Sequence, residues 1–314
     1  MPLTHFPYGV SSFGCPVMPS FPFSGDSRYY YVDNVYGNDG NSGTDPSQAF
    51  KTIAKANTVM RSGYYDTCFI IGLGTAYVLA APLLITNSYV NFVGLCSNVQ
   101  LSQRARITNG TTLMSPMVTN SGTGNTFINL QFANFGNDTT AAAICFEDTG
   151  QRNYYQACQF AGGGSSAARG NAAMRSLVIS GSGGENLFRN CTIGLDTILG
   201  TGANYELEIN GGSPRNMFDH CDIIKNSGAA GFFFLIGASG IDRFVEFREC
   251  TFYNFTGGGG ASLTDAYTIN AAAGGNVIMR LCLFIGMTAL PASSLVFGDP
   301  TAASTAILKG LSPT

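Results

Sequence analysis

One short pattern recurs through most of the chain and restricts its fold more than any other feature. An aromatic residue, or Met in the last copy, is followed three positions later by Cys or Leu, then by a residue that is polar except in the last copy, and then by an apolar residue. The copies are 127–132, 155–160, 188–193, 218–223, 247–252 and 279–284, with a weaker first copy at 92–95. Counted from Leu95, the steps are 35, 28, 33, 30, 29 and 32 residues. A repeat near 30 residues indicates a solenoid.

A second strand pattern lies between these copies. Its members are 177–181, 207–211, 234–237 and 267–270, and Gly or Ser follows each one before the next aromatic copy. The chain also contains 40 Gly and only 11% charged residues, and its repeats show no helical periodicity. We therefore expect an all-β fold, a right-handed parallel β-helix of about seven coils with strands about 4.8 Å apart.

Two repeat positions should form internal ladders. The aromatic ladder is Phe127, Tyr155, Phe188, Phe218 and Phe247, and the thiol ladder is Cys158, Cys191, Cys221, Cys250 and Cys282. None of the nine Cys lies in a Cys-x-x-Cys or Cys/His cluster, so we expect buried reduced thiols and neither a metal nor another cofactor. Asn129 and Asn190 precede the ladder position and suit a left-handed bend there.

The ends of the chain differ from the repeats. Residues 1–27 carry five Pro and are expected to form an extended arm, and residues 28–314 a single β-helix domain. Within that domain, residues 28–61 should form a cap and 62–314 the coils and the C-terminal tail. A short cap helix could begin at Asp45-Pro46 and run to Met60. The Asp/Asn-rich loop 38–46 predicts turns rather than a calcium site, because it lacks a closing Glu.

Charge and hydropathy exclude some partners. The formal net charge is −3 and no apolar stretch is long enough to span a bilayer, so we expect neither nucleic-acid nor membrane binding. The N-terminus lacks a basic region followed by an apolar run, so no secretory signal is expected. The Gly-rich stretches are not followed by Lys-Ser or Lys-Thr, which argues against a phosphate-binding loop.

Two resemblances add to this reading. Residues 31–53, with Tyr31-Val32-Asp33, Gly37-Asn38-Asp39-Gly40 and Gly43-Thr44-Asp45-Pro46, resemble the start of many pectate-lyase-like β-helix proteins, which include polysaccharide enzymes and phage tailspikes. Residues 3–17, from Leu3-Thr4-His5-Phe6-Pro7 to Cys15-Pro16-Val17, resemble the opening of virion structural proteins of tailed bacteriophages. The second resemblance implies a head or tail component without an enzymatic cofactor.

Candidate catalytic carboxylates are present. Glu206 and Glu208 alternate with apolar residues and should face outward, about 7 Å apart. Asp219 and Asp222 flank Cys221. Arg189, Asp219, Arg248 and Arg280 share one repeat position, which predicts a structural charge ladder that occupies Asp219. A solvated strand face is the simpler reading of the two Glu, so we expect no catalytic residues and no enzyme.

The favoured function is therefore structural: a phage virion protein, of the capsid decoration (cement) type. Its arm would bind the major capsid protein through Phe6, Tyr8, Val10, Phe13, Val17, Phe21 and Phe23, because an unstructured segment this apolar normally buries its side chains on a partner. The alternative is a tailspike or fibre protein that binds or cleaves host surface glycans; a free polysaccharide lyase is a third reading.

The run Phe232-Phe233-Phe234 suggests an oligomer. A strand hides only alternate side chains inside, so Phe233 should emerge on the outer face. A homotrimer with its β-helices side by side would bury it.

Overall fold

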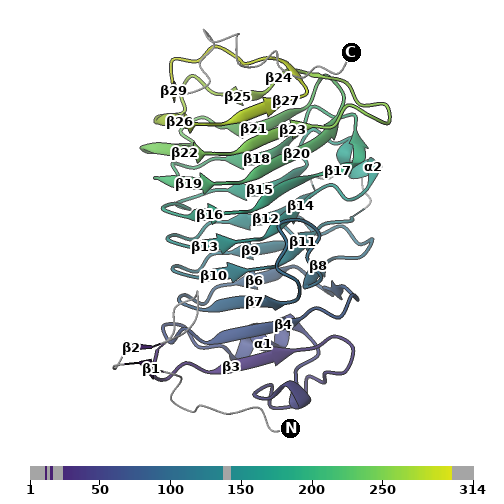
Figure 1. The fold of residues 1–314 in the computed structure, drawn as a ribbon, viewed down its shortest axis with the longest axis vertical. Coiled ribbons are helices and arrows are strands. Elements are labelled where there is room, and N and C mark those ends of the chain that lie inside the picture. The colour runs from purple at the N-terminus through teal and green to yellow at the C-terminus, as the bar shows by residue number, and fades with distance from the viewer. Residues whose placement is uncertain (1–10, 13–14, 17–23, 137–142, 299–314) are drawn as a thin grey trace.

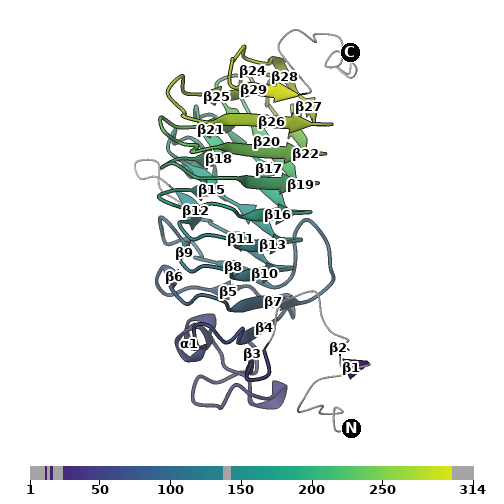
Figure 2. The same cartoon turned by 90° about the vertical axis from the view of Figure 1, so that its left-hand side faces the viewer.

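The computed structural model describes residues 11–12, 15–16, 24–136 and 143–298 of this 314-residue chain. Three parallel sheets run along the length of the molecule, and each coil contributes one strand to each sheet (Figure 1 and Figure 2). The third sheet has seven strands, so the chain forms a parallel β-helix of about seven coils, in agreement with the sequence prediction.

The three sheets are named here in the order in which a coil meets them. The first sheet contains β3 (Tyr29–Val32), β4 (Thr67–Ile71), β7 (Asn91–Leu95), β10 (Thr126–Ile128), β13 (Tyr154–Gln156), β16 (Leu187–Arg189), β19 (Asn216–Asp219), β22 (Phe244–Arg248), β26 (Asn276–Arg280) and β29 (Val296–Gly298). The second contains β5 (Tyr77–Val78), β8 (Arg106–Thr108), β11 (Gln131–Ala133), β14 (Gln159–Ala161), β17 (Thr192–Gly200), β20 (Asp222–Ser227), β23 (Thr251–Asn254) and β27 (Leu283–Ile285). The third contains β6 (Leu83–Ile85), β9 (Val118–Asn120), β12 (Ile144–Asp148), β15 (Arg175–Ile179), β18 (Tyr205–Ile209), β21 (Phe232–Ile236) and β25 (Tyr267–Ile269).

Two short pairs lie outside these sheets. β1 (Ser11–Ser12) pairs antiparallel with β2 (Cys15–Pro16), and β24 (Leu263–Asp265) pairs parallel with β28 (Met287–Ala289).

Both predicted ladders are present in the core. Consecutive rings from Phe127 to Phe247 stack with centroids 4.9, 4.5, 4.8 and 4.9 Å apart. Such offset pairs contribute about 0.5–1.5 kcal/mol each beyond the burial of their area. The five thiols of the second ladder are buried and free, as predicted, and each donates to a backbone carbonyl of the previous coil.

A left-handed bend separates the first sheet from the second in each coil. Asn129 and Asn190 have φ of 56° and 49°, as predicted, and the same bend in other coils uses Ala157, His220, Glu249 and Leu281. Another ladder stabilises the turn before the first sheet, where side-chain oxygens of Asn125, Asn153, Asn186 and Asn216 accept backbone N–H groups of the preceding coil. These Asn stand two residues before the four copies that begin at 127, 155, 188 and 218, a spacing that our prediction did not use.

The N-terminal part of the domain contains two short helical segments in place of one continuous helix. A 3₁₀ turn, η1 (Pro46–Gln48), is capped by Asp45, and α1 (Ile53–Val59) begins after Thr52, whose hydroxyl accepts the Lys55 N–H. The segment is interrupted because Ala49 and Thr52 adopt extended backbone. Buried Ile53 and Ala56 pack α1 against β3 and β4. Asp39 accepts both the Lys51 and Thr52 N–H groups, so this loop forms turns.

A second helix, α2 (Ser166–Arg169), lies on the outside of the coils. Neither α-helix in the described part of the chain has the length or apolarity to cross a bilayer.

The prediction for Phe233 is wrong. Its side chain is fully buried and packs edge-on against Phe252 and Phe284. Strict alternation does not hold where the chain turns into β21, because the Phe233 N–H bonds to the Ala266 carbonyl outside the regular pairing of β21 with β25. Phe232 is instead the partly exposed ring, and it stacks on Tyr205. Phe233 therefore offers no contact to a second copy of the chain.

Candidate functional site

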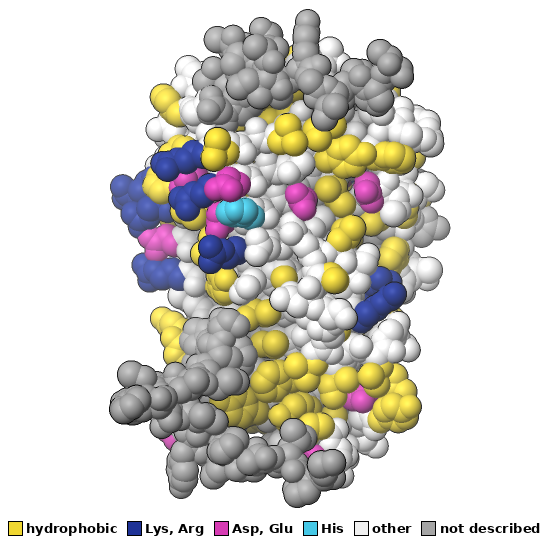
Figure 3. Space-filling model, in the orientation of Figure 1, with side chains coloured by type: hydrophobic (Ala, Val, Ile, Leu, Met, Phe, Trp, Pro, Cys, Tyr) yellow, Lys and Arg dark blue, Asp and Glu magenta, His cyan; other side chains and the backbone are white. Residues whose placement is uncertain are grey.

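Charged side chains gather on the outer face of the first sheet, over its C-terminal coils (Figure 3). The Arg heads lie above the carboxylates: the side chains of Arg189 and Asp219 are 51% and 7% exposed, and those of Arg280 and Glu246 61% and 7%. A ligand approaching this face would meet guanidinium groups first. Guanidinium groups donate in a planar fork that suits sugar carboxylates and hydroxyls.

The predicted charge ladder is only partly formed. Arg189 Nε lies 3.1 Å from Asp219 Oδ2, as expected for neighbouring coils. Arg248 pairs with Glu246 on its own strand, at 3.1 Å, and Arg280 also pairs with Glu246, at 3.2 Å. Asp219 is therefore held by one Arg and by its sequence neighbour, His220.

His220 links two carboxylates at the bend. Its Nδ1 lies 3.0 Å from Asp219 Oδ1, and its Nε2 lies 3.0 Å from Glu249 Oε2 on the next coil. The two ring nitrogens of His220 therefore contact carboxylates of two successive coils. The His220 and Glu249 side chains are about half exposed, so both are open to a ligand.

Asp222 follows the same bend and faces outward from β20. Inward-facing Cys221 places His220 on the left-handed bend and Asp222 on the outer face, because successive strand residues alternate. Partial burial raises the pKa of the Asp222 carboxyl above 3.8, although a hydrogen bond with Thr251 acts in the opposite direction. The Gln100 carboxamide donates to Asp222 Oδ2 at 2.8 Å. Asp222 is thus an outward-facing carboxyl that holds its proton to a higher pH than an exposed one.

Glu206 and Glu208 do not form an open pair. The expectation that both face outward is wrong for Glu206, which is fully buried at the register position of Phe233, where the chain departs from strict alternation. Glu208 is the partly exposed member of the two. Arg169 Nη2 and Lys225 Nζ lie 2.9 and 3.2 Å from Glu206 Oε1, and the Ser176 hydroxyl donates to Oε2 at 2.6 Å.

The charges of this buried cluster pair with one another inside the protein. Burial alone would raise the pKa of Glu206, but the Arg169 and Lys225 charges bring it below its usual value. Burial lowers the pKa of Lys225 to about 8. Glu208 is engaged by Arg175, so neither Glu is available to a substrate in this conformation.

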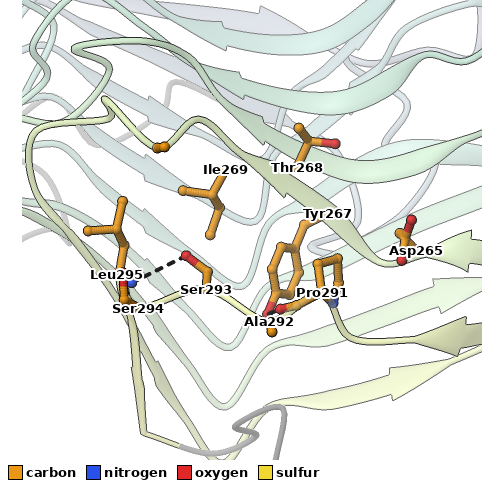
Figure 4. A pocket seen from close by; sticks show the side chains of 10 residues that line it. Asp265, Tyr267, Thr268, Ile269, Pro291, Ala292, Ser293, Ser294 and Leu295 are labelled. Carbon is orange, nitrogen blue, oxygen red and sulfur yellow. Dashed lines mark hydrogen bonds between the residues drawn. The ribbon is translucent and has the colours of Figure 1, made fainter.

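A pocket of about 450 Å³ lies at the C-terminal end of the β-helix (Figure 4). Tyr267, Pro291 and the segment 292–295 form its walls, and Asp265 is the one carboxylate among the lining residues. Its polar groups are largely used within the protein: the Tyr267 hydroxyl donates to the Pro291 carbonyl, and the Leu295 N–H donates to the Ser293 hydroxyl. The pocket lacks the paired acid and base groups found at the bend.

The predicted capsid-anchoring residues Phe6, Tyr8, Val10, Phe13, Val17, Phe21 and Phe23 lie outside the described residues. The predicted anchoring on a major capsid protein therefore stays a prediction, as do the homotrimer and the virion location.

Comparison with known proteins supports the fold. No family model and no curated protein sequence matches the chain. Among solved structures, it resembles a pectin methylesterase from Aspergillus niger with a TM-score of 0.52 at 17% identity, covering 89% of this chain and 83% of the other. It also resembles a pectin methylesterase in complex with a hexasaccharide, with a TM-score of 0.56 at 15% identity over 91% and 98% of the two chains. A pectate lyase matches with a TM-score of 0.54 at 12% identity over 83% of this chain and 63% of the other.

These comparisons confirm the pectate-lyase-like right-handed β-helix and correct one expectation. The chain was expected not to be an enzyme, but the structures it resembles are pectin methylesterases, a pectate lyase and a rhamnogalacturonan lyase. The sequence argument rested in part on a charge ladder that would occupy Asp219, and the structure forms that ladder only in part. None of these comparisons points to a bacteriophage particle.

Proposed function

We propose that the protein acts on a carbohydrate polymer at the bend formed by Asp219, His220, Asp222 and Glu249. The observation that carries this proposal is Asp222, a partly buried carboxyl of raised pKa that faces outward beside the His220 pair of carboxylates. The shared fold of the pectin methylesterases and of the pectate and rhamnogalacturonan lyases supports it. This is the glycan-acting alternative that the sequence left open.

Asp222 would act as a proton donor, a role that several cleavage reactions share. Hydrolysis of an ester, hydrolysis of a glycosidic bond and elimination across a glycosidic bond all release an oxygen that must gain a proton. A protonated Asp222 would supply that proton and become a carboxylate. Glu249, half exposed on the next coil, would accept the proton removed from water or from a sugar carbon.

The surrounding cations would position the polymer. Arg189 and Arg248 flank the bend, with side chains 51% and 38% exposed. Sugar hydroxyls or carboxylates bound to these guanidinium groups would place a linkage over Asp222. The same groups would stabilise negative charge that develops on the substrate during cleavage.

The test is an activity screen on purified protein with neutral and acidic polysaccharides, including methyl-esterified pectin and polygalacturonate. Methanol release, new reducing ends and unsaturated products distinguish the three reactions. We expect product from at least one polymer, and a loss of about 100-fold or more in rate for Asp222→Asn, since proton transfer contributes about 10²–10⁴-fold.

Asp242→Asn is the matched control, because Asp242 is an exposed carboxylate paired with Arg243 before β22, away from the bend. It should keep the full rate. Full activity in Asp222→Asn, or no product from any polymer, would overturn the proposal.

A further inference from the structure

A segment of the chain itself lies across the candidate site. Residues 97–104, called the strap here, belong to the connection between β7 and β8 and rise across the neighbouring coils (Figure 1 and Figure 2). The strap reaches side chains far away in sequence: the Ser102 N–H donates to Gln159 Oε1, the Thr192 hydroxyl donates to the Gln100 carbonyl, and the Gln100 carboxamide donates to Asp222, each at 2.8 Å.

The surface beneath the strap is a row of polar groups. Gln131, Gln159, Thr192 and Asp222 are register partners on β11, β14, β17 and β20, one per coil, and all face outward. Neighbouring strands lie about 4.8 Å apart, so the row presents hydrogen-bonding groups at that interval along the molecule. Only Asp222 in this row is charged.

The strap docks through Gln100 and Gln103, and its other side chains are exposed. Val99 and Leu101 are 43% and 44% exposed, whereas Gln103 is fully buried with its side-chain oxygen unpartnered. Ser102 has φ of 58°, a left-handed conformation that is unfavourable for a residue with a side chain. The contacts with the row beneath therefore hold the strap at a conformational cost at Ser102.

The ends of the strap allow it to leave without unwinding a coil. Cys96 and Ala105 meet at its base, where the Ala105 N–H donates to Cys96 Sγ at 3.4 Å. The Asn129 carboxamide anchors the same base by donating to the Cys96 carbonyl at 3.0 Å. The coil-forming residues on either side therefore stay joined when the strap moves away.

We propose that the strap is an internal occupant of a binding surface, the polar row, for an extended, uncharged, hydroxyl-rich chain, and that this polymer displaces it. The row offers an acceptor at Gln159, a donor at Thr192 and a carboxyl at Asp222, and strap atoms complement all three. Sugar hydroxyls both donate and accept, so one polyhydroxylated chain satisfies the same groups. This inference rests on the proposed function, which it extends with a substrate class for that part of the site and a self-inhibiting contact.

A polymer can bind the row only when the strap is displaced, so its apparent affinity is reduced by the small fraction of molecules in that open state. Loosening the strap should raise this fraction and tighten binding. Gln100→Ala removes the contact with Asp222, and a second variant replaces residues 98–103 with a short Gly-Ser linker. With neutral gluco- and galacto-hexaoses as probes, we expect each variant to bind at least one probe about 10-fold more tightly than wild type. Val99→Ser, on the outer side of the strap, is the control and should bind like wild type.

Trypsin cleavage after Arg104, an exposed residue of the strap, reports displacement without any need for activity. We expect the bound hexaose to accelerate this cleavage in the wild-type protein. Protection of Arg104 by the hexaose, or unchanged affinity in both strap variants, would overturn the inference. If the strap tests fail but turnover still depends on Asp222, only the role of the strap is wrong. If turnover is absent or independent of Asp222, the proposed function is wrong. The trypsin result then still decides whether the strap moves.

Discussion

Asp148 illustrates how this fold accommodates a carboxyl inside its core. It occupies an inward position of β12, in register with Asn120 below and Ile179 above. Its oxygens accept hydrogen bonds from Tyr155 at 2.7 Å, from the Gly150 N–H at 2.9 Å and from the Asn120 side chain at 3.2 Å. Burial nevertheless outweighs these donors and raises the pKa of Asp148 to about 7.

This shift predicts a pH dependence of stability. In the unfolded chain Asp148 ionises near its ordinary pKa of 3.8, whereas in the folded chain it keeps its proton to about pH 7. Its contribution to stability is therefore complete below about pH 4 and is lost as the pH rises through 7. Urea unfolding at pH 5 and pH 8 should show a smaller difference between the two pH values in Asp148→Asn than in wild type. Glu147→Gln, a change at a neighbour that bonds Ser180 at the surface, should behave like wild type; an equal difference in all three proteins would contradict this assignment.

At the scale of elements, α2 depends on one buried cluster. Arg169 at its end contacts Glu206, and the Asn204 side chain donates to the Arg169 carbonyl at 2.7 Å. Lys225 from β20 completes the cluster, so a short external helix, the second sheet and the third sheet meet at one carboxylate. With Glu206 neutral, two cations would face each other without water.

Glu206→Gln should therefore destabilise the protein by about 3–5 kcal/mol, the usual effect of removing one partner from a buried ion pair. Chemical denaturation measures this loss. Asp242→Asn, which breaks an exposed pair, should cost less than about 1 kcal/mol. A loss below that level for Glu206→Gln would show that the cluster does not hold α2.

The elements predicted from the sequence are those that repeat. Aromatic residues and Cys recur at one step per coil, so the stacked positions could be read from their spacing, and the bend could be read from Asn129 and Asn190. The inward direction of Phe233 could not be predicted, because it depends on where β21 departs from regular alternation. The position of the strap could not be predicted either, because Gln100 and Asp222 are 122 residues apart and no repeat links them.

At the scale of the whole molecule, the outer face of the first sheet carries different side chains in its N-terminal and C-terminal coils. In the N-terminal coils, Tyr29 and Tyr31 stack on Phe69, with ring centroids 6.0 and 5.3 Å apart. In the C-terminal coils the same face carries the Arg and carboxylate groups (Figure 3). The strap spans the outer face of the second sheet beside this boundary, so an extended polymer along the molecule would contact the bend and the polar row together.

The location of a bound glycan tests this account most directly. Hydroxyl-radical footprinting with a saturating oligosaccharide substrate compares side-chain protection across the whole chain. We expect protection in the peptides that contain His220, Asp222 and Glu249, with increased reactivity of Val99 and Leu101 as the strap is displaced. Protection confined to the third sheet around β15, β18 and β21, with no change at the bend, would contradict the central claim that this chain acts on glycans at that bend.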